Sequence, residues 1–152
     1  MIETTLCYIE KENKYLMLHR IKKENDMNKD KWLGIGGKLQ KNETPLACIL
    51  REALEETGLK LLNPILRGIV NFNSDIYPSE RMYLFTCTEF SGTITECDEG
   101  VLEWIDKDKI SSLPLWEGDK VFFEALNNGE QNFEITLNYT GDTLASHKKE
   151  WL

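Results

Sequence analysis

The 152-residue sequence lacks the closely spaced cysteines and histidines that build zinc sites and disulfide scaffolds. Its four cysteines form no C-x-x-C pair, and its two histidines lie far apart in the sequence. A zinc site or a disulfide framework is recognised by such spacings, so we expect neither. We interpret the cysteines as small buried or half-buried residues. They are Cys7, Cys48, Cys87 and Cys97.

An excess of basic residues and a long apolar run are also missing. The chain has 26 acidic and 18 basic side chains, a formal net charge of −8. Binding to duplex nucleic acid needs a basic stripe, so we expect no polymeric nucleic acid partner. No apolar run approaches membrane-spanning length, and the N-terminus has no basic segment followed by an apolar one. These absences favour a cytoplasmic protein with no membrane partner.

The remaining composition is that of an ordinary globular protein. Hydrophobic residues make up 41% of the chain, and the length is enough for one sizeable core. No internal repeat or low-complexity block divides the sequence. We therefore predict a single domain over residues 1–152, present as a monomer or a homodimer. An acidic protein of this kind can still bind a small polyphosphate when metal ions carry the positive charge.

The stretch from residue 37 to residue 59 organises the chain. Thr44 followed by Pro45 predicts a helix start, because the hydroxyl caps free amides and proline loses no needed donor there. Gly58 predicts its end, since glycine readily takes the left-handed conformation. We predict a helix over residues 45–57. A period of about 100° per residue predicts an apolar side of Leu46, Ile49, Leu50, Ala53 and Leu54. It places on the other side Cys48, Arg51, Glu52, Glu55 and Glu56.

Three glutamates of this helix crowd one another. Glu52, Glu55 and Glu56 are spaced i, i+3, i+4, and two of them lie in the last turn, where the helix dipole disfavours negative charge. Such conflicts are expected at functional sites. Mg²⁺ would resolve this one, because it takes oxygen ligands and bridges carboxylates to substrate phosphates. The alternative is a solvated acidic face with an Arg51–Glu55 pair.

The full pattern is G-x5-E-x7-R-E-U-x-E-E-x-G-U, where U is apolar. Its fixed positions are Gly37, Glu43, Arg51, Glu52, Glu55, Glu56 and Gly58. This pattern resembles a Nudix box, the signature of enzymes that hydrolyse nucleoside diphosphates linked to another group. The resemblance implies an α/β (α+β) fold, an α/β/α sandwich in which a mixed sheet is flanked by two main helices.

The resemblance also implies a cofactor, Mg²⁺ with Mn²⁺ as a substitute, and roles for individual residues. Arg51 and Glu43 would orient the catalytic carboxylates. Glu99 lies where the family places an acid that binds metal or takes a proton from the attacking water, so either Glu52 or Glu99 would be the general base. The alternative for Glu99 is an exposed turn acid. The implied metal ligands are Gly36, through its carbonyl, and Glu52, Glu55, Glu56 and Glu99.

Beyond the box, the chain resembles the MutT-type and oxidised purine nucleoside triphosphatase branch. Such enzymes release pyrophosphate from 8-oxo-dGTP and so sanitise the nucleotide pool. Trp116 and Phe72 match the aromatic residues that hold the base. Leu33 and Asp119 stand at base-reading positions, although Leu33 replaces an asparagine and residues 117–119 replace paired acids. Phosphate contacts are expected from Arg20 and Lys38. The alternatives are solvated surface charges for these two cations, plain core aromatics for Trp116 and Phe72, and an ordinary helix N-terminal acid for Asp119.

The rest of the chain reads as strands, turns and one more helix. Residues 2–9 and 15–20 predict a hairpin, residues 21–31 a mobile loop beside the site, and residues 61–72 strands broken at Asn63-Pro64. Alternation over residues 131–140 predicts a half-buried strand at or near an edge. Further strands are predicted at 82–90, 93–97 and 101–105, a helix at 117–127, and a polar tail at 141–152.

Three functions are compatible with these patterns. The first is a Mg²⁺-dependent nucleoside triphosphate pyrophosphohydrolase acting on 8-oxo-dGTP. The second keeps the box but takes ADP-ribose, a dinucleoside polyphosphate or an ordinary dNTP. The third is a nucleotide-binding regulator without turnover. Regulators on this fold usually lose box carboxylates, and none is lost here.

Overall fold

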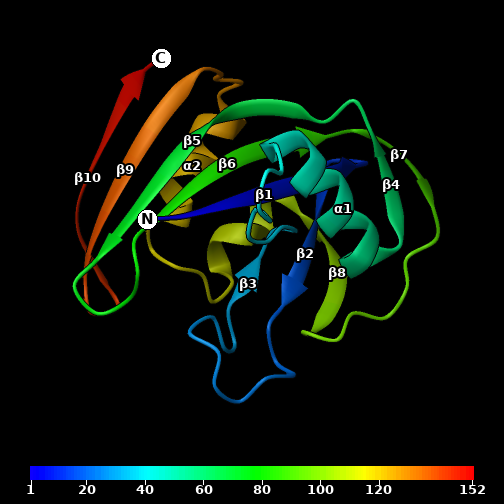
Figure 1. Cartoon of the computed structure of the whole chain (residues 1–152), viewed down its shortest axis with the longest axis horizontal. Helices are drawn as coiled ribbons and strands as arrows, with labels where there is room; N and C mark the ends of the chain where they lie inside the picture. Colours follow the sequence, from blue (N-terminus) through cyan, green and yellow to red (C-terminus); the bar gives the residue numbers. More distant parts are fainter.

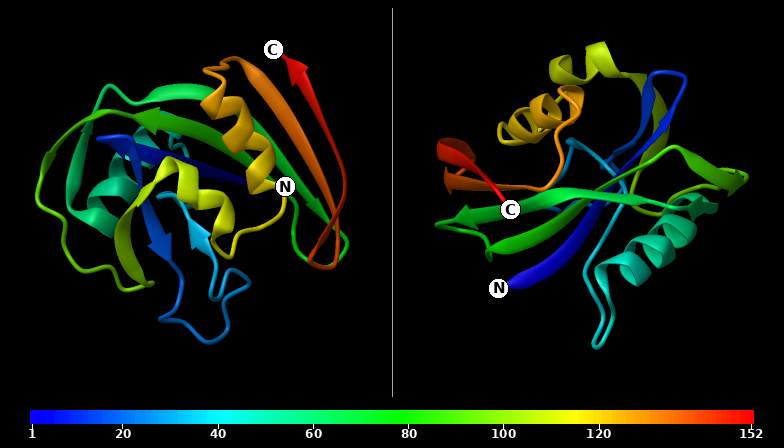
Figure 2. Two further views of the ribbon diagram at one scale, coloured as in Figure 1. Left: turned by 180° about the vertical axis from the view of Figure 1, so that it is seen from behind. Right: turned by 90° about the horizontal axis from the view of Figure 1, so that it is seen from above.

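A mixed β-sheet with helices on both faces forms the body of the protein (Figure 1). The computed structural model describes residues 1–152. Helix α1 (Pro45–Thr57) covers one face of the sheet, while α2 (Asp119–Asn127) and the short 3-10 helix η1 (Lys107–Ser112) cover the other, as Figure 2 shows. The chain therefore has the predicted three-layer α/β/α arrangement.

Eight of the strands form the main sheet, in the order β10-β9-β5-β6-β1-β2-β3 with β8 also paired to β2. The pairs β1–β6 and β5–β9 are parallel, and the other pairs are antiparallel. Strands β4 and β7 form a separate two-stranded sheet. The strands are β1 (Ile2–Lys11), β2 (Lys14–His19), β3 (Trp32–Leu33), β4 (Leu59–Leu62), β5 (Ile65–Ser74), β6 (Glu80–Cys87), β7 (Glu89–Gly92), β8 (Val101–Asp106), β9 (Phe133–Thr140) and β10 (Thr143–Trp151).

A fork between β1 and β2 creates the space for a site. The two strands pair only beside their connecting turn, at Glu10–Tyr15 and Lys11–Lys14. Beyond that point β2 pairs with β8, while β1 stays with β6. The segment that follows β3 returns to β1 through isolated bridges, one of them between Cys7 and Ile35. The glycine-rich residues 34–37 are thereby held at the open end of the fork.

Helix α1 has the predicted bounds and the predicted caps. The Thr44 hydroxyl accepts a hydrogen bond from the Ala47 amide at 3.1 Å, and Pro45 follows it. Gly58 ends the helix with a φ of 80° and donates its amide to the Leu54 carbonyl at 3.0 Å. Local sequence therefore determines where this helix begins and ends.

The predicted apolar side of α1 is wrong for its leucines. Leu46, Leu50 and Leu54 are exposed, whereas Ile49 and Ala53 are fully buried. The other buried residues of the helix are Cys48, Glu56 and Thr57. The helix packs through this narrower stripe, which brings the thiol of Cys48 within 3.6 Å of the Gly37 carbonyl. Turning the leucines inward would rotate the acidic side away from the glycine-rich segment.

Three further predictions needed correction. Residues 93–97 form no strand and instead cross the end of α1, where the Thr95 amide donates to the Thr57 carbonyl at 2.8 Å. Helix α2 begins at Asp119, two residues later than predicted, because Gly118 is its N-cap. Residues predicted as a polar tail form β10, so β9 is an inner strand. The exposed side chains of β10 give no apolar pattern, and only main-chain pairing reveals the strand.

The interior has two apolar clusters, one on each face of the sheet. The larger, of 17 buried residues, lies on the α2 side and includes Tyr8, Phe122 and Phe133. The smaller, of 12, lies on the α1 side and includes Ile49 and Phe85. Both helices are thus anchored by hydrophobic burial. No helix is long and apolar enough to cross a bilayer.

The corrected helix face can be tested with two matched truncations. Ile49 is 0% exposed and Leu54 is 55% exposed. Ile49→Ala should therefore lower the free energy of unfolding by about 2–5 kcal/mol, and Leu54→Ala by less than about 1 kcal/mol. Urea denaturation followed by circular dichroism measures both. The reverse order of the two losses would show that the leucine stripe faces the core.

Candidate active site

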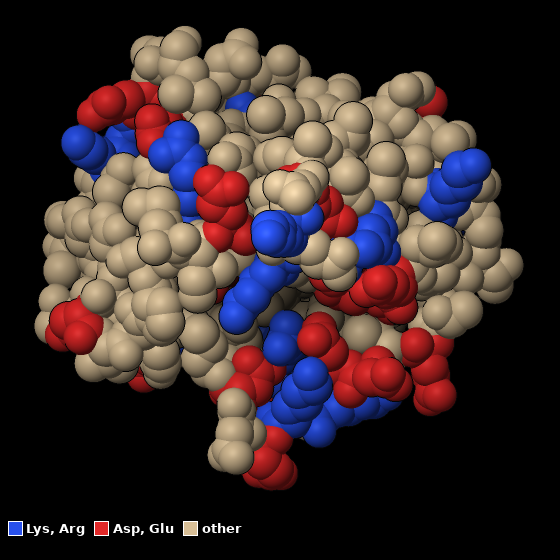
Figure 3. All heavy atoms as spheres, in the orientation of Figure 1, with Lys and Arg blue, Asp and Glu red and all other residues tan.

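A cavity of about 230 Å³ occupies the fork between β1 and β2. It lies beside the loop that joins β2 to β3, and Figure 3 shows charged side chains of both signs crowded around a hollow in this region. Many of the predicted site residues line the cavity together. These are Arg20, Leu33, Gly36, Lys38, Glu56, Phe72, Trp116 and Asp119. The remaining predicted residues, Glu43, Arg51, Glu52, Glu55 and Glu99, do not line it.

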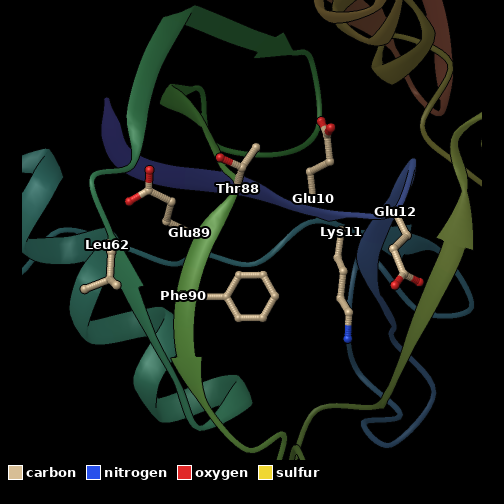
Figure 4. A pocket seen from close by; sticks show the side chains of 7 residues that line it. All are labelled: Glu10, Lys11, Glu12, Leu62, Thr88, Glu89 and Phe90. Carbon is tan, nitrogen blue, oxygen red and sulfur yellow. The ribbon is translucent and has the colours of Figure 1, made fainter.

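A wider hollow of about 620 Å³ lies at the opposite end of β1 (Figure 4). The ring of Phe90 points into it and stacks against Trp104 with ring centroids 5.9 Å apart. The hollow contains none of the predicted site residues. Its lining is Glu10, Lys11, Glu12, Leu62, Thr88, Glu89 and Phe90. The candidate site is therefore identified by the chemistry of its lining residues and not by its volume.

Two glycines bring backbone close to the acidic side of α1. The carbonyls of Ile35 and Gly37 accept hydrogen bonds from the amides of β1, whereas the Gly36 carbonyl between them accepts none. A Cβ on Gly36 would lie 1.9 Å from the Thr5 carbonyl oxygen, and one on Gly37 would lie 2.6 Å from the Glu52 carboxyl carbon. Only glycine allows both close approaches.

Arg51 joins the box into one hydrogen-bonded unit. Its Nε and Nη2 donate to the two oxygens of Glu43 at 2.8 and 3.0 Å, and its Nη1 donates to Glu52 at 2.8 Å and Glu55 at 3.3 Å. Nη2 also donates to the Lys38 carbonyl at 3.2 Å. Hydrogen bonds from Arg51 lower the pKa of Glu43 to about 2. Arg51 therefore fixes carboxylates instead of facing the cavity.

Glu56 is a buried acid with an unused oxygen. Its Oε2 has no hydrogen-bond partner. Burial, and then the negative charges of Glu99 and Glu52, raise the pKa of Glu56 to about 9. An unpaired buried carboxylate is costly unless a cation or proton neutralises it. The carboxylates of Glu52 and Glu56, with the unpaired Gly36 carbonyl, are hard oxygen donors and thus fit Mg²⁺.

The other two predicted metal ligands have cationic partners. Glu99 lies 3.3 Å from Arg20 Nη1 and 3.5 Å from Lys23 Nζ. The Glu55 side chain is 59% exposed and contacts Arg51. No three acidic, cysteine or histidine side chains form a cluster arranged to hold a metal ion. The structure thus brings Glu52 and Glu99 close enough to Glu56 to raise its pKa, while Glu55 and Glu99 are also held in salt bridges.

Arg20 ties the long loop of residues 21–31 to the end of β2. Its Nε donates to Asp26 Oδ2 at 2.8 Å, and its Nη1 approaches Glu99. The backbone amide of Asn28 donates to the other oxygen of Asp26 at 3.0 Å. The loop, predicted to be mobile, is therefore held by side-chain contacts on the cavity side.

Aromatic rings form the other end of the cavity. The Trp116 ring meets Phe72 and Tyr139 edge to face, with centroids 5.6 and 5.3 Å away. Lys31 Nζ lies 4.7 Å from the Trp116 ring centroid. Such an apolar wall with a few fixed polar groups is typical of small-molecule sites.

Asp119 is a buried carboxyl in this aromatic end. Its residue is 7% exposed, so it is not an ordinary surface acid at a helix start. Burial raises the pKa of Asp119 to about 8, against the opposing influence of Lys31. At neutral pH the carboxyl is then mostly protonated, and it offers both a donor and an acceptor.

Sequence reasoning missed several lining residues. Tyr139 belongs to a predicted strand, and the alternation of β9 does turn it inward. Glu80 lies just before the strand predicted at 82–90, whereas in the structure it begins β6. Met27 and Asn28 come from the irregular loop, which has no periodicity from which to infer direction. Only the folded arrangement could identify these two.

A model of the NUDIX domain matches residues 3–126. The chain belongs to the Nudix family. It is 30% identical over 141 residues to the Nudix hydrolase YvcI of Bacillus subtilis, covering 90% of this chain and 85% of that one. It is 31% identical over 129 residues to the oxidised purine nucleoside triphosphate hydrolase of Danio rerio, covering 83% and 81%.

The crystal structure of a MutT protein from Bacillus halodurans superimposes on this Nudix chain with a TM-score of 0.87. The two are 29% identical, and the match covers 99% of this chain and 98% of that one. The similarity spans both ends of the cavity as well as the box helix. It agrees with the fold that the box predicted.

The buried carboxyl of Asp119 should make stability depend on pH. The folded protein keeps the proton up to about pH 8, whereas the unfolded chain loses it near pH 4. The free energy of unfolding should therefore fall between these values, by about 1.4 kcal/mol per pH unit from this group. Asp119→Asn removes this titration and should be the more stable protein at high pH.

Urea denaturation from pH 5 to pH 9 measures the difference between wild type and Asp119→Asn. Asp142→Asn, in the exposed turn before β10, is the matched control and should follow the wild-type profile. Parallel curves for wild type and Asp119→Asn would contradict the raised pKa.

Proposed function

We propose that this Nudix hydrolase is a Mg²⁺-dependent nucleoside triphosphate pyrophosphohydrolase that acts on 8-oxo-dGTP. It would release the nucleoside monophosphate and pyrophosphate. One observation carries the proposal: a single cavity is lined both by Glu56 and Gly36 and by Trp116, Phe72 and Asp119. A nucleotide has the same polarity, with a charged polyphosphate at one end and a flat base at the other.

The phosphate end supplies the groups that hydrolysis of a phosphoanhydride needs. Glu52, Glu56 and the Gly36 carbonyl would hold the metal. When bound, Mg²⁺ supplies positive charge to the phosphate oxygens and lowers the pKa of a nearby water. Arg51 keeps the Glu52 carboxylate in place through its hydrogen bond of 2.8 Å.

Proton transfer and charge neutralisation are assigned to side chains around the cavity. Glu52 or Glu99 accepts the proton of the attacking water, whose oxygen bonds to phosphorus as the anhydride bond breaks. Lys38 and Arg20 line the cavity as cations and would contact the phosphate oxygens. Arg20 must first exchange its pairing with Glu99 for the substrate.

The aromatic residues of the cavity favour a purine base, and the polar groups beside them determine which purine binds. Phe72 and Trp116 offer aromatic surface, and Asp119 offers a carboxyl to the edge of the base. The similarity to the Danio rerio oxidised purine hydrolase supports an oxidised purine. Leu33 in the cavity wall favours a second candidate, another nucleoside diphosphate derivative, because it cannot make the hydrogen bond of the asparagine that it replaces.

A substrate panel tests the proposal directly. Purified protein with Mg²⁺ should convert 8-oxo-dGTP to monophosphate and pyrophosphate with a higher kcat/KM than dGTP, ADP-ribose or a dinucleoside polyphosphate. Product chromatography measures each. Equal or better turnover of one of the other compounds would replace 8-oxo-dGTP as the substrate, and no turnover of any would favour a nucleotide-binding regulator.

Removing the charge of Glu56 should abolish most of the activity while the fold persists. Glu56→Gln should lower kcat at least about 100-fold, because the site loses a carboxylate that would hold the metal ion against the substrate phosphates. Glu96→Gln is the matched control, since Glu96 is an exposed acid outside the cavity. Wild-type kcat in Glu56→Gln would remove this residue from the mechanism.

Divalent metal should also stabilise the protein in the absence of substrate. Millimolar Mg²⁺ or Mn²⁺ should raise the melting temperature, because a cation that binds the folded state selectively stabilises it by mass action. The rise should be smaller in Glu56→Gln. Differential scanning fluorimetry measures both, and identical melting curves with and without metal would argue against a preformed site.

A further inference from the structure

Asn28, a polar residue of the β2–β3 loop, lines the cavity and lies outside the Nudix box. It belongs to the aromatic end, where its Oδ1 accepts a hydrogen bond from Trp116 Nε1 at 2.7 Å. Because an indole N–H can only donate, this contact fixes which end of the carboxamide is oxygen. The amide nitrogen Nδ2, with two N–H donors, makes no hydrogen bond within the protein.

The backbone of Asn28 is fixed as well as its side chain. Its amide donates to Asp26 Oδ1 at 3.0 Å, while Asp26 Oδ2 accepts from Arg20 Nε at 2.8 Å. Arg20 follows the end of β2, so the chain of contacts runs from the sheet to the loop. A residue held through its side-chain oxygen and its backbone amide is already oriented before a ligand arrives, which lowers the entropy lost on binding.

Trp116 links this carboxamide to the buried carboxyl of the site. Its indole N–H holds Asn28, and its backbone carbonyl accepts the amide of Asp119 at 3.0 Å. Asn28 and Asp119 both line the cavity. A base packed against the Trp116 ring would therefore meet polar groups from two different elements, the loop and the start of α2.

We propose that Asn28 is a specificity residue that donates a hydrogen bond from Nδ2 to an acceptor atom on the nucleobase. The inference rests on the proposed function and adds a base-reading residue to it. It also accounts for Leu33, since the donor missing at that position is supplied from the loop. A carbonyl-bearing 6-oxopurine suits this donor, whereas the amino group of a 6-aminopurine would face it with another donor.

The sharpest test replaces the donor and keeps the shape. Asn28→Asp retains an oxygen that can accept from Trp116 Nε1 and puts an acceptor in place of Nδ2. With 8-oxo-dGTP or dGTP, kcat/KM should fall about 5- to 100-fold, mainly through KM, because an unpaired polar contact is costly in a buried site. The ratio of dATP to dGTP turnover should rise.

Two controls separate base recognition from a structural role. Deoxyribose 5-triphosphate carries no base, so its kcat/KM should be unchanged in Asn28→Asp. Asn25→Asp, an exposed substitution in the same loop, should leave every substrate unchanged. Melting temperature and tryptophan fluorescence confirm that the variants are folded.

The outcomes are distinct. An equal loss on the base-free triphosphate would overturn the inference, because Asn28 would then only shape the loop. Wild-type kcat/KM and base preference in Asn28→Asp would overturn it too. A wild-type protein that hydrolyses none of the nucleotides would instead overturn the proposed function.

Discussion

The guanidinium of Arg51 is the contact on which the arrangement of the site depends. It bonds at once to the loop acid Glu43, to Glu52 on its own helix and to the backbone of Lys38, which follows the glycine-rich residues 34–37. Three pieces of chain are thereby fixed to one another around a planar cation. The positive charge of Arg51 offsets the repulsion between the neighbouring carboxylates. Its side chain does this from outside the cavity.

The divergence of β1 and β2 opens the cavity beside the carboxylates that Arg51 holds. If the two strands stayed paired, neither the glycine-rich segment nor the β2–β3 loop could reach the face of β1. The opening instead places backbone carbonyls and acids beside aromatic rings from β5, β9 and the segment before α2. A polar end and a flat apolar end are thus built from elements that are distant in the sequence.

Local signals predicted the parts of the fold that local chemistry controls. Thr44, Pro45 and Gly58 determine α1 residue by residue, and the alternation of β9 predicts its buried face. The rotation of α1 about its axis was not predictable from periodicity. The helix turns Glu56 and Cys48 toward the glycine-rich residues and leaves three leucines exposed. The box predicted the acidic site, whereas the wall formed by the irregular loop needed tertiary contacts.

The last strand has a consequence for contacts between the sheet edges of neighbouring molecules. As the final strand of the main sheet, β10 leaves one row of backbone donors and acceptors facing water. Lys148, Lys149 and Glu150 lie on this edge strand and are exposed. Charged side chains on such an edge discourage the addition of a strand from a neighbouring molecule, which is the usual first step of edge-to-edge aggregation. The charged sequence of β10, which has no apolar pattern, therefore also disfavours the addition of a further strand to this edge.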